Sequence, residues 1–560
     1  MSLIPVQRCL KMPSFLKQRL SLRSRLKHFF ISLLTAGLLA GCAGNSLPWK
    51  SQPTSTPLAP GLFGFATPEP STDTLLPGAT PFPSLTPLMV LPMQGSPTPG
   101  GIDTNPVAGA EAATPTLPPL NISGPLLRYN AQSGDTLEIV AKRFGVGTDE
   151  IISDVNLPAP ELLLQPDTLL LIPNRLPEEL SSRERAIPDS EIFYSPSTIG
   201  FDIVDYVNKQ NGYLSAYKEY LMTYGLTSGA RAVQQIAWDN SLNPRILLAI
   251  IEYESHWVLG QPTNIAQDDY PLGYHHFLYK RLFRQMMWAS GSLSNGFYRW
   301  RSGDLTELTF GDGSTLHLDP RLNAGTAAIQ YFFSLTRDRA GWEQAVADTG
   351  FPSLYRRMFG DPWERAAAVE PTISGGLTQP ALTLPFEPGQ VWSYSGGPHS
   401  VWELEGGALA AIDFAPAASV TGCIKSDQWV VAPANGIVAR AGDAVVVLDL
   451  DGDGLEQTGW NILFLHVGSQ DRIKAGSVLK AGDRIGHASC EGGSATGANL
   501  HIARKYNGEW ILTDGPIPFN MDGWVARGNG LPYKGTLTRG DKIIEACACG
   551  AFATRVIRDK

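Results

Sequence analysis

The chain has 560 residues, of which 43% are hydrophobic and 17% are charged, and its formal net charge is −9 at pH 7. This length is sufficient for roughly two to four domains with buried cores. An acidic chain repels a phosphate backbone, so the charge argues against nucleic acid as a partner.

The first 41 residues have the pattern of an export signal. Seven Lys and Arg precede an apolar segment, residues 29–39, that is too short for a comfortable membrane span. The segment leads into Leu39-Ala40-Gly41-Cys42, which resembles the lipoprotein box of bacteria. The resemblance implies that Cys42 carries acyl chains, which would attach an exported lipoprotein to a membrane at the cell envelope. An ordinary signal peptide with a chance cysteine is the alternative.

Residues 42–126 are rich in Pro, Ser, Thr and Gly. Such a composition buries too little apolar surface to fold, and its prolines favour extended backbone. We therefore predict a tether that holds the folded part away from the membrane. The composition does not distinguish this role from that of an inert spacer.

Residues 127–174 are predicted to form a small β-α-α-β domain. Asp135 and Glu138 have the spacing of a capping box, and a helical apolar face follows them. A second helix is expected from Thr148, and strand-like segments flank the pair. The unit resembles a LysM module. This resemblance implies binding of N-acetylglucosamine polymers near Gly134, Asp135, Thr136 and Leu137.

Residues 175–379 are predicted to form an all-α, lysozyme-like domain. Asn243-Pro244 begins a helix that is apolar on most sides and ends near Glu254. The pattern resembles lytic transglycosylases, in which such a carboxylic acid, with a raised pKa, protonates a glycosidic oxygen. The Gly-Leu-Met-Gln segment of that family is absent from this sequence, however. We therefore interpret Glu254 as a doubtful acid/base in a domain that binds or positions glycan.

Residues 380–560 read as a mostly-β, antiparallel domain. Short β-branched segments alternate with Gly and Asp turns, as at residues 444–448, 461–465 and 500–503. His399, Asp413 and His501 supply two imidazoles and one carboxylate. This set suits Zn²⁺ with one open position, the arrangement of a catalytic zinc site.

The segments that carry these residues resemble the β-lytic branch of the lysostaphin-like zinc endopeptidases, which cut peptide stems of bacterial cell wall. Gly396-Gly397-Pro398-His399, Ala411-Ile412-Asp413-Phe414, Leu465-His466 and Asn499-Leu500-His501 follow one another in the order of that family. The resemblance implies that His399, Asp413 and His501 are zinc ligands and that His466 is catalytic. Asn499 replaces a histidine of the family pattern, and alternation places it on the same strand face as His501.

Two further features lie in this region. Four cysteines remain beyond Cys42, which allows three disulfide connectivities, among them Cys423–Cys490. Residues 449–454 imitate the start of a calcium loop, but position twelve is Trp460 and not Glu, which favours a plain hairpin turn.

Together these patterns predict a zinc metalloendopeptidase that binds peptidoglycan glycan through its LysM module and cuts the peptide crosslinks. The alternative is a weak or inactive peptidase domain that activates wall amidases or acts as a scaffold, because Asn499 departs from the family pattern.

Overall fold

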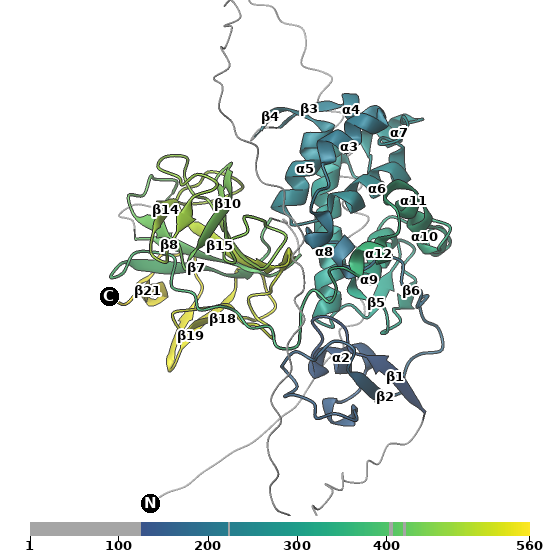
Figure 1. The fold of residues 1–560 in the computed structure, drawn as a ribbon, viewed down its shortest axis with the longest axis horizontal. Helices are drawn as coiled ribbons and strands as arrows, with labels where there is room; N and C mark the ends of the chain where they lie inside the picture. Colours follow the sequence, from purple (N-terminus) through teal and green to yellow (C-terminus); the bar gives the residue numbers. More distant parts are fainter. Residues whose placement is uncertain (1–124, 222–223, 403–406, 418–421) are drawn as a thin grey trace, which may run out of the picture. The chain divides into compact units, whose positions relative to one another are not determined.

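The computed structural model describes residues 125–221, 224–402, 407–417 and 422–560 (Figure 1). The predicted signal segment, Cys42 and nearly all of the predicted tether lie outside these residues. Within the described ranges, no helix combines the length and the apolar character needed to cross a bilayer.

The LysM-like unit contains two antiparallel strands, one α-helix and one 3₁₀ turn. These are β1 (Leu126–Asn130), α2 (Leu137–Phe144), η1 (Thr148–Glu150) and β2 (Leu169–Pro173). The predicted second helix is wrong, because the helical turn at Thr148 stops after three residues. Ile152 then forms a bridge with Leu171, so its backbone bonds to strand β2 and cannot continue a helix.

Residues 185–372 are mainly helical, with two short hairpins. The helices are α3 (Ile203–Gln210), α4 (Tyr213–Ala216), α5 (Gly229–Asp239), α6 (Pro244–Ser255), α7 (Ile265–Asp269), α8 (Leu282–Arg301), α9 (Ala324–Ser334), α10 (Arg339–Val346), α11 (Phe351–Phe359) and α12 (Pro362–Ala366). Short 3₁₀ turns, η2 (Asp189–Glu191), η3 (Pro196–Thr198) and η4 (Phe277–Tyr279), connect some of them.

The prediction of an all-α domain is wrong in one respect. Strands β3 (Lys218–Leu221) and β4 (Gly225–Ser228) pair, as do β5 (Glu307–Thr309) and β6 (Thr315–His317). The second hairpin turns at Gly311-Asp312-Gly313, where Gly313 has a φ of 84°. A Gly-Asp-Gly turn between alternating segments favours a hairpin, and this local preference outweighs the helical character of the surrounding chain.

Helix α6 begins and ends where the sequence predicts. The Asn243 side chain accepts a hydrogen bond from the Arg245 amide, and Pro244 occupies the first turn. The helix ends at His256, which has a φ of 59°. Its residues from Pro244 to Glu252 are all buried, which accounts for the apolar character on most of its sides.

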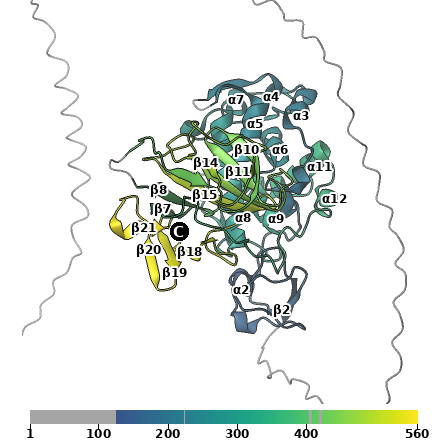
Figure 2. The same cartoon turned by 60° about the vertical axis from the view of Figure 1, so that its left-hand side comes forward.

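The C-terminal region is built on a nine-stranded antiparallel sheet, green to yellow in Figures 1 and 2. The path of the sheet runs β13-β10-β11-β12-β15-β8-β7-β21, and β16 pairs with β15. The bounds are β7 (Val391–His399), β8 (Ala411–Pro416), β10 (Gly436–Gly442), β11 (Val445–Asp449), β12 (Trp460–Leu465), β13 (Val478–Leu479), β15 (Leu500–Tyr506), β16 (Glu509–Trp510) and β21 (Arg555–Ile557).

Two smaller sheets complete this region, and a 3₁₀ turn, η5 (Phe552–Thr554), precedes β21. The first of these sheets pairs β9 (Trp429–Val431) with β14 (Arg484–His487). The second has the strand order β17 (Asn520–Met521), β18 (Trp524–Gly528), β19 (Gly535–Arg539) and β20 (Lys542–Glu545). The mostly-β, antiparallel prediction is confirmed for this part of the chain.

The two faces of the large sheet belong to different apolar clusters. Ile462, Phe464 and Ile502 lie in a cluster made only of C-terminal residues. Leu463 and Ala503, one position along, lie in a cluster that also contains buried helix residues such as Phe297 and Trp300. Side chains therefore alternate along each strand between two faces of the sheet. One face packs against other C-terminal residues, and the other packs against the helical region.

Candidate metal and catalytic site

Three neighbouring strands bring the predicted metal ligands together. His399 ends β7, Asp413 lies in β8 and His501 lies in β15, and these strands are adjacent in the sheet. His501 pairs directly with Asp413, so both side chains project from the same face. The strand register thus joins residues that are 88 positions apart in the sequence.

The donor atoms of this trio are almost equidistant. His399 Nε2 lies 3.0 Å from His501 Nδ1, which lies 3.1 Å from Asp413 Oδ1. The third side, from His399 Nε2 to Asp413 Oδ1, is 3.3 Å. Ligands held about 2.0–2.1 Å from a tetrahedral zinc ion are about 3.3 Å apart from one another. The residues present therefore fit three corners of a tetrahedral site, which leaves the fourth corner for another ligand.

Hydrogen bonding and burial prepare these side chains to bind a cation. The Gly397 carbonyl is 2.7 Å from His399 Nδ1, which must donate to it, so Nε2 is left with its lone pair. Burial lowers the pKa of His501 to about 4 despite the opposing effect of Asp413, so this imidazole is neutral near pH 7. Burial acts to raise the pKa of Asp413, but His399 and His501 outweigh it and hold that pKa well below its usual range. The carboxylate is therefore charged.

The glycines before His399 allow close packing around the trio. A Cβ on Gly396 would lie 2.5 Å from Asp413 Oδ2, and a Cβ on Gly397 would lie 2.6 Å from the Lys534 backbone. Neither position accepts a side chain without displacing its neighbour. The Gly396-Gly397 pair is therefore required by the geometry of the site.

His466 lies beside this trio. It follows β12 with a φ of 65°, and its ring centroid is 6.2 Å from that of His501. Its Nδ1 donates to the Glu491 carbonyl at 2.9 Å, so Nε2 is the nitrogen able to accept a proton. Burial lowers the pKa of His466, which keeps the ring neutral near pH 7. The predicted catalytic histidine thus stands next to His399, Asp413 and His501 in a form that can accept a proton.

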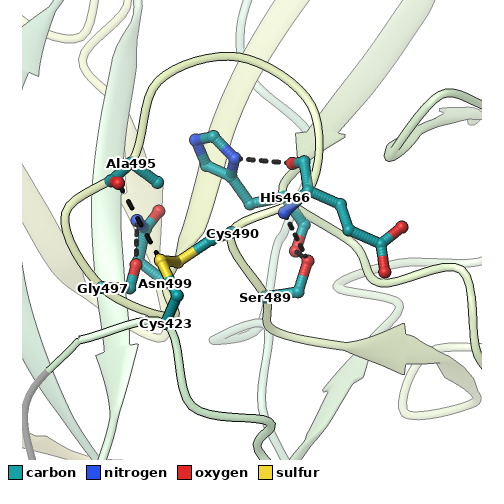
Figure 3. Close-up of a disulfide and its surroundings, with 8 residues drawn as sticks. Cys423, His466, Ser489, Cys490, Ala495, Gly497 and Asn499 are labelled. Atoms are coloured by element: carbon teal, nitrogen blue, oxygen red, sulfur yellow. Dashed lines mark hydrogen bonds between the residues drawn. A yellow bond between two sulfur atoms is a disulfide. The ribbon is translucent and has the colours of Figure 1, made fainter. Parts of the chain in front are cut away.

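Asn499 is held beside a disulfide. Cys423 and Cys490 are joined, and Figure 3 shows this bond next to Asn499 and His466. The Asn499 side-chain Nδ2 donates to the Gly497 carbonyl at 2.9 Å, and its backbone amide bonds to Ser489. Its Oδ1 is buried and has no hydrogen-bond partner among the described residues. The amide oxygen is therefore available to a ligand or to water. The other two cysteines, Cys547 and Cys549, also form a disulfide.

Tyr533 is a neighbour of the trio that sequence reasoning missed. Its ring stacks on His399 at a centroid distance of 4.1 Å, and its backbone bonds to Gly397 and Pro398. Burial raises the pKa of its hydroxyl, and Asp413 adds to the rise. Tyr533 lies 134 residues beyond His399, in a Gly- and Pro-rich loop with no strand or helix periodicity that could place it. Only the backbone pairing reveals its position.

The predicted glycan-binding residues divide into two groups. Asp135 is buried and forms an ion pair with Arg143, and Leu137 belongs to the core of the unit. Both side chains therefore point into the unit, and the glycan-binding role of these two positions stays a prediction. Thr136 caps helix α2, and together with Gly134 it lines a cavity of about 740 Å³.

Glu254 does not stand alone in a cleft. It forms an ion pair with Arg337 at 2.7 Å, and its side chain is 12% exposed. Burial raises the pKa of Glu254, and Arg337 opposes that rise. Gly273 packs against the carboxylate, since a Cβ there would lie 2.8 Å from Oε2. The ion pair with Arg337 occupies the carboxylate although its pKa is raised, so a catalytic role for Glu254 stays a doubtful prediction.

Comparison with known proteins identifies two parts of the chain. Residues 129–173 match the LysM domain, and residues 185–372 match the N-terminal domain of LasA. The chain is 25% identical over 298 residues to the protease LasA of Pseudomonas aeruginosa, from two strains. The match covers 49% of this chain and 65% of the relative, slightly less than two thirds of its length. This chain is a LysM-containing protein similar to the protease LasA.

Solved structures of metallopeptidases also match the C-terminal region. The M23 metalloprotease pseudoalterin, from the deep sea, is 19% identical, with a TM-score of 0.26; the match covers 30% of this chain and 96% of that one. The catalytic domain of lysostaphin from Staphylococcus simulans is 21% identical, with a TM-score of 0.16, over 22% of this chain and 87% of that one.

The matches to LasA and to the LysM domain confirm the predicted resemblance to a lysostaphin-like peptidase with a LysM module. The lipoprotein signal stays a prediction, and so does the lysozyme-like character of the middle region, where the match is to a LasA domain.

Proposed function

We propose that this LasA-like chain is a zinc-dependent peptidoglycan peptidase that cuts peptide stems or crosslinks. The observation that carries the proposal is the convergence of His399, Asp413 and His501, whose donor atoms lie 3.0–3.3 Å apart. Similarity to a protease supports the reaction class. The LysM domain supports cell-wall glycan as the surface to which the chain binds.

The trio would hold the zinc ion through His399 Nε2, His501 Nδ1 and a carboxylate oxygen of Asp413. When bound, zinc supplies Lewis-acid polarisation of the scissile carbonyl and lowers the pKa of water. The hydrogen bond from His399 Nδ1 to Gly397 holds the imidazole in one tautomer, which keeps Nε2 directed at the site.

His466 would accept the proton during the reaction, and Asn499 would stabilise the charge that develops on the substrate. Neutral His466 accepts a proton at Nε2 while Nδ1 stays bonded to Glu491. Asn499 cannot accept a proton near neutral pH, but its amide orients water or donates a hydrogen bond. We therefore expect turnover to be slow, because one of the two expected bases is an amide.

The remaining parts would place this chemistry at the cell wall. In the proposal, Cys42 is lipidated and attaches the chain to a membrane of the envelope, and residues 42–126 provide the reach to peptidoglycan. Replacement of Cys42 by serine should then abolish incorporation of labelled palmitate, whereas the chain should still be exported.

The test of the activity is digestion of purified peptidoglycan by the full chain, with products identified by mass spectrometry. We expect new peptide termini with the wild type and none with His399→Ala. The matched control is His487→Ala, because His487 is a mostly buried histidine of the same region that bonds to the Gln428 carbonyl outside the trio. Equal products from His399→Ala and the wild type contradict the proposal.

A second candidate function is supported by Asn499 alone. A domain that lacks one base could act as an activator of wall amidases and release no peptide itself. The discriminating measurement adds an amidase to the same digestion. Stimulation of amidase products by wild type and His399→Ala alike, without peptide cleavage, favours the activator.

A further inference from the structure

The connection between β11 and β12 gathers three carboxylates. Asp449, Asp451 and Asp453 each offer an oxygen, and these oxygens lie within 4.8 Å of one another. Like charges at that separation repel. Amides of the loop donate to Asp449 and Asp453 and reduce this cost, and a bound cation would neutralise the charge. We call residues 449–461 the aspartate loop.

A buried amide supplies independent evidence for a ligand in this loop. Asn461 is 0% exposed and pairs in register with Asp449, so both side chains project from one face. Its Nδ2 donates to the Thr458 carbonyl at 2.7 Å and to the Leu455 carbonyl at 3.4 Å, which places the amide inside the loop. Its Oδ1, on the same carbon, has no hydrogen-bond partner among the described residues. A buried amide oxygen without a partner is costly unless it binds something.

We propose that the aspartate loop binds one calcium ion. Its ligands would be oxygens from the carboxylates and from the buried Asn461 amide, with the carbonyl at the seventh position of the loop as a further donor: Asp449, Asp451, Asp453, Asn461 and Leu455. Calcium takes six to eight oxygen ligands in flexible geometry and binds loops with carboxylates at positions one, three and five and a carbonyl at seven.

Asn461 also answers the objection that position twelve is Trp460. The Trp460 ring packs against Tyr506, so it does not face the loop. Strand alternation turns the next residue, Asn461, toward Asp449 in its place. An amide oxygen is a single neutral ligand, whereas glutamate is bidentate and charged. We therefore expect a dissociation constant in the weaker range, about 10⁻⁴–10⁻³ M.

The donor set separates calcium from other cations. Every proposed donor is an oxygen, and the group of candidate ligands among the described residues contains no histidine or cysteine, so zinc is disfavoured. Magnesium demands octahedral geometry and keeps several waters, so it is a poor fit to a loop that offers five protein oxygens.

Calcium would also stabilise a contact with the helical region. Glu456, within the loop, accepts hydrogen bonds from Arg440 at 2.5 Å and from Lys505 at 2.9 Å. Arg440 in turn lies 3.3 Å from Asp239 of helix α5. A cation that orders the loop therefore holds Glu456 in place and, through Arg440, the packing of α5 on the sheet.

The experiment is calorimetric titration of calcium chloride into the zinc-loaded full chain, with magnesium chloride as the competing probe. We expect one calcium site and at least tenfold weaker binding in Asp451→Asn/Asp453→Asn. The matched control, Asp541→Asn, changes an exposed aspartate in the β19–β20 turn and should bind like the wild type. His501→Ala should also retain calcium, which separates this site from the zinc trio.

A second measurement detects calcium through the stability of the protein. Calcium at about a hundred times its dissociation constant should raise the melting temperature of the wild type by several degrees and leave that of the double variant unchanged. Three results overturn the proposal: no stoichiometric binding by the wild type at millimolar calcium, equal affinity in the double variant, or equal affinity for magnesium.

Discussion

Replacement of Asn499 by histidine tests the one position at which the predicted site departs from the family pattern. Strand alternation predicts that Asn499, two positions before His501, shares its face. The Asn499 Oδ1 is buried without a hydrogen-bond partner among the described residues. An imidazole at this position would add a group that accepts a proton near neutral pH. Asn499→His should therefore accelerate peptide cleavage and leave the zinc content unchanged.

The magnitude follows from what a positioned base contributes. General acid–base catalysis is typically worth about 10²–10⁴-fold, or roughly 3–5 kcal/mol of activation free energy. His466 already stands 6.2 Å from His501, ring to ring, and in the proposed mechanism it would supply part of that contribution. We therefore expect a gain at or below the lower end of this range, about 10–10²-fold in turnover, for Asn499→His.

The assay is release of peptide termini from purified peptidoglycan by zinc-loaded protein, with zinc measured in the same samples. The control is Asn520→His, an exposed asparagine of β17 in the same region. An unchanged rate in Asn499→His, with full zinc content, would falsify the prediction that residue 499 faces the predicted metal ligands. A large gain from a wild type with no activity would instead support the amidase activator.

Four further outcomes are expected. His501→Ala should lose stoichiometric zinc in elemental analysis, because two donor atoms cannot hold a tetrahedral site; full metal content contradicts the ligand assignment. Deletion of residues 127–174 should reduce retention on insoluble peptidoglycan, and equal retention removes the LysM unit from the proposal. Glu254→Gln should leave the products unchanged, whereas loss of anhydro-muropeptides made by the wild type contradicts our interpretation. Burial opposes ionisation of Glu456, but Arg440 and Lys505 outweigh it and lower the pKa of Glu456 from 4.5 to about 2. The ionised carboxylate therefore stabilises the folded state above pH 4.5, and this contribution is lost as the pH falls toward 2. It amounts to about 3 kcal/mol, and Glu456→Gln should remove it in urea unfolding at pH 7 but not at pH 2.

Local chemistry alone determined several features of this protein. The Asn-Pro start of α6 follows from a side chain that caps the helix and a ring that presets its first turn. Strands β11, β12 and β15 follow from short β-branched segments between turns. Residue types made His399, Asp413 and His501 a donor set suited to zinc, and the order of the motifs that carry them led to their prediction as ligands.

Other features depended on contacts between distant segments. Register between β8 and β15 decides that His501 faces Asp413, since a slip of one residue would turn it to the other face. Pairing of Ile152 with Leu171 takes the place of the predicted second LysM helix. Leu171 lies 19 residues after Ile152, so the local sequence around Ile152 does not reveal this pairing. Tyr533 reaches His399 through backbone pairing of two loops.

The aspartate loop shows the same division within a few residues. The sequence by itself determined the spacing of its three carboxylates. It also placed Trp460 at position twelve, where a calcium loop carries glutamate. Only the tertiary structure decided that Asn461 turns its amide into the loop, because that orientation depends on which strand lies opposite Asp449. Sequence spacing specifies which groups a segment carries, whereas the partner strand determines where those groups point.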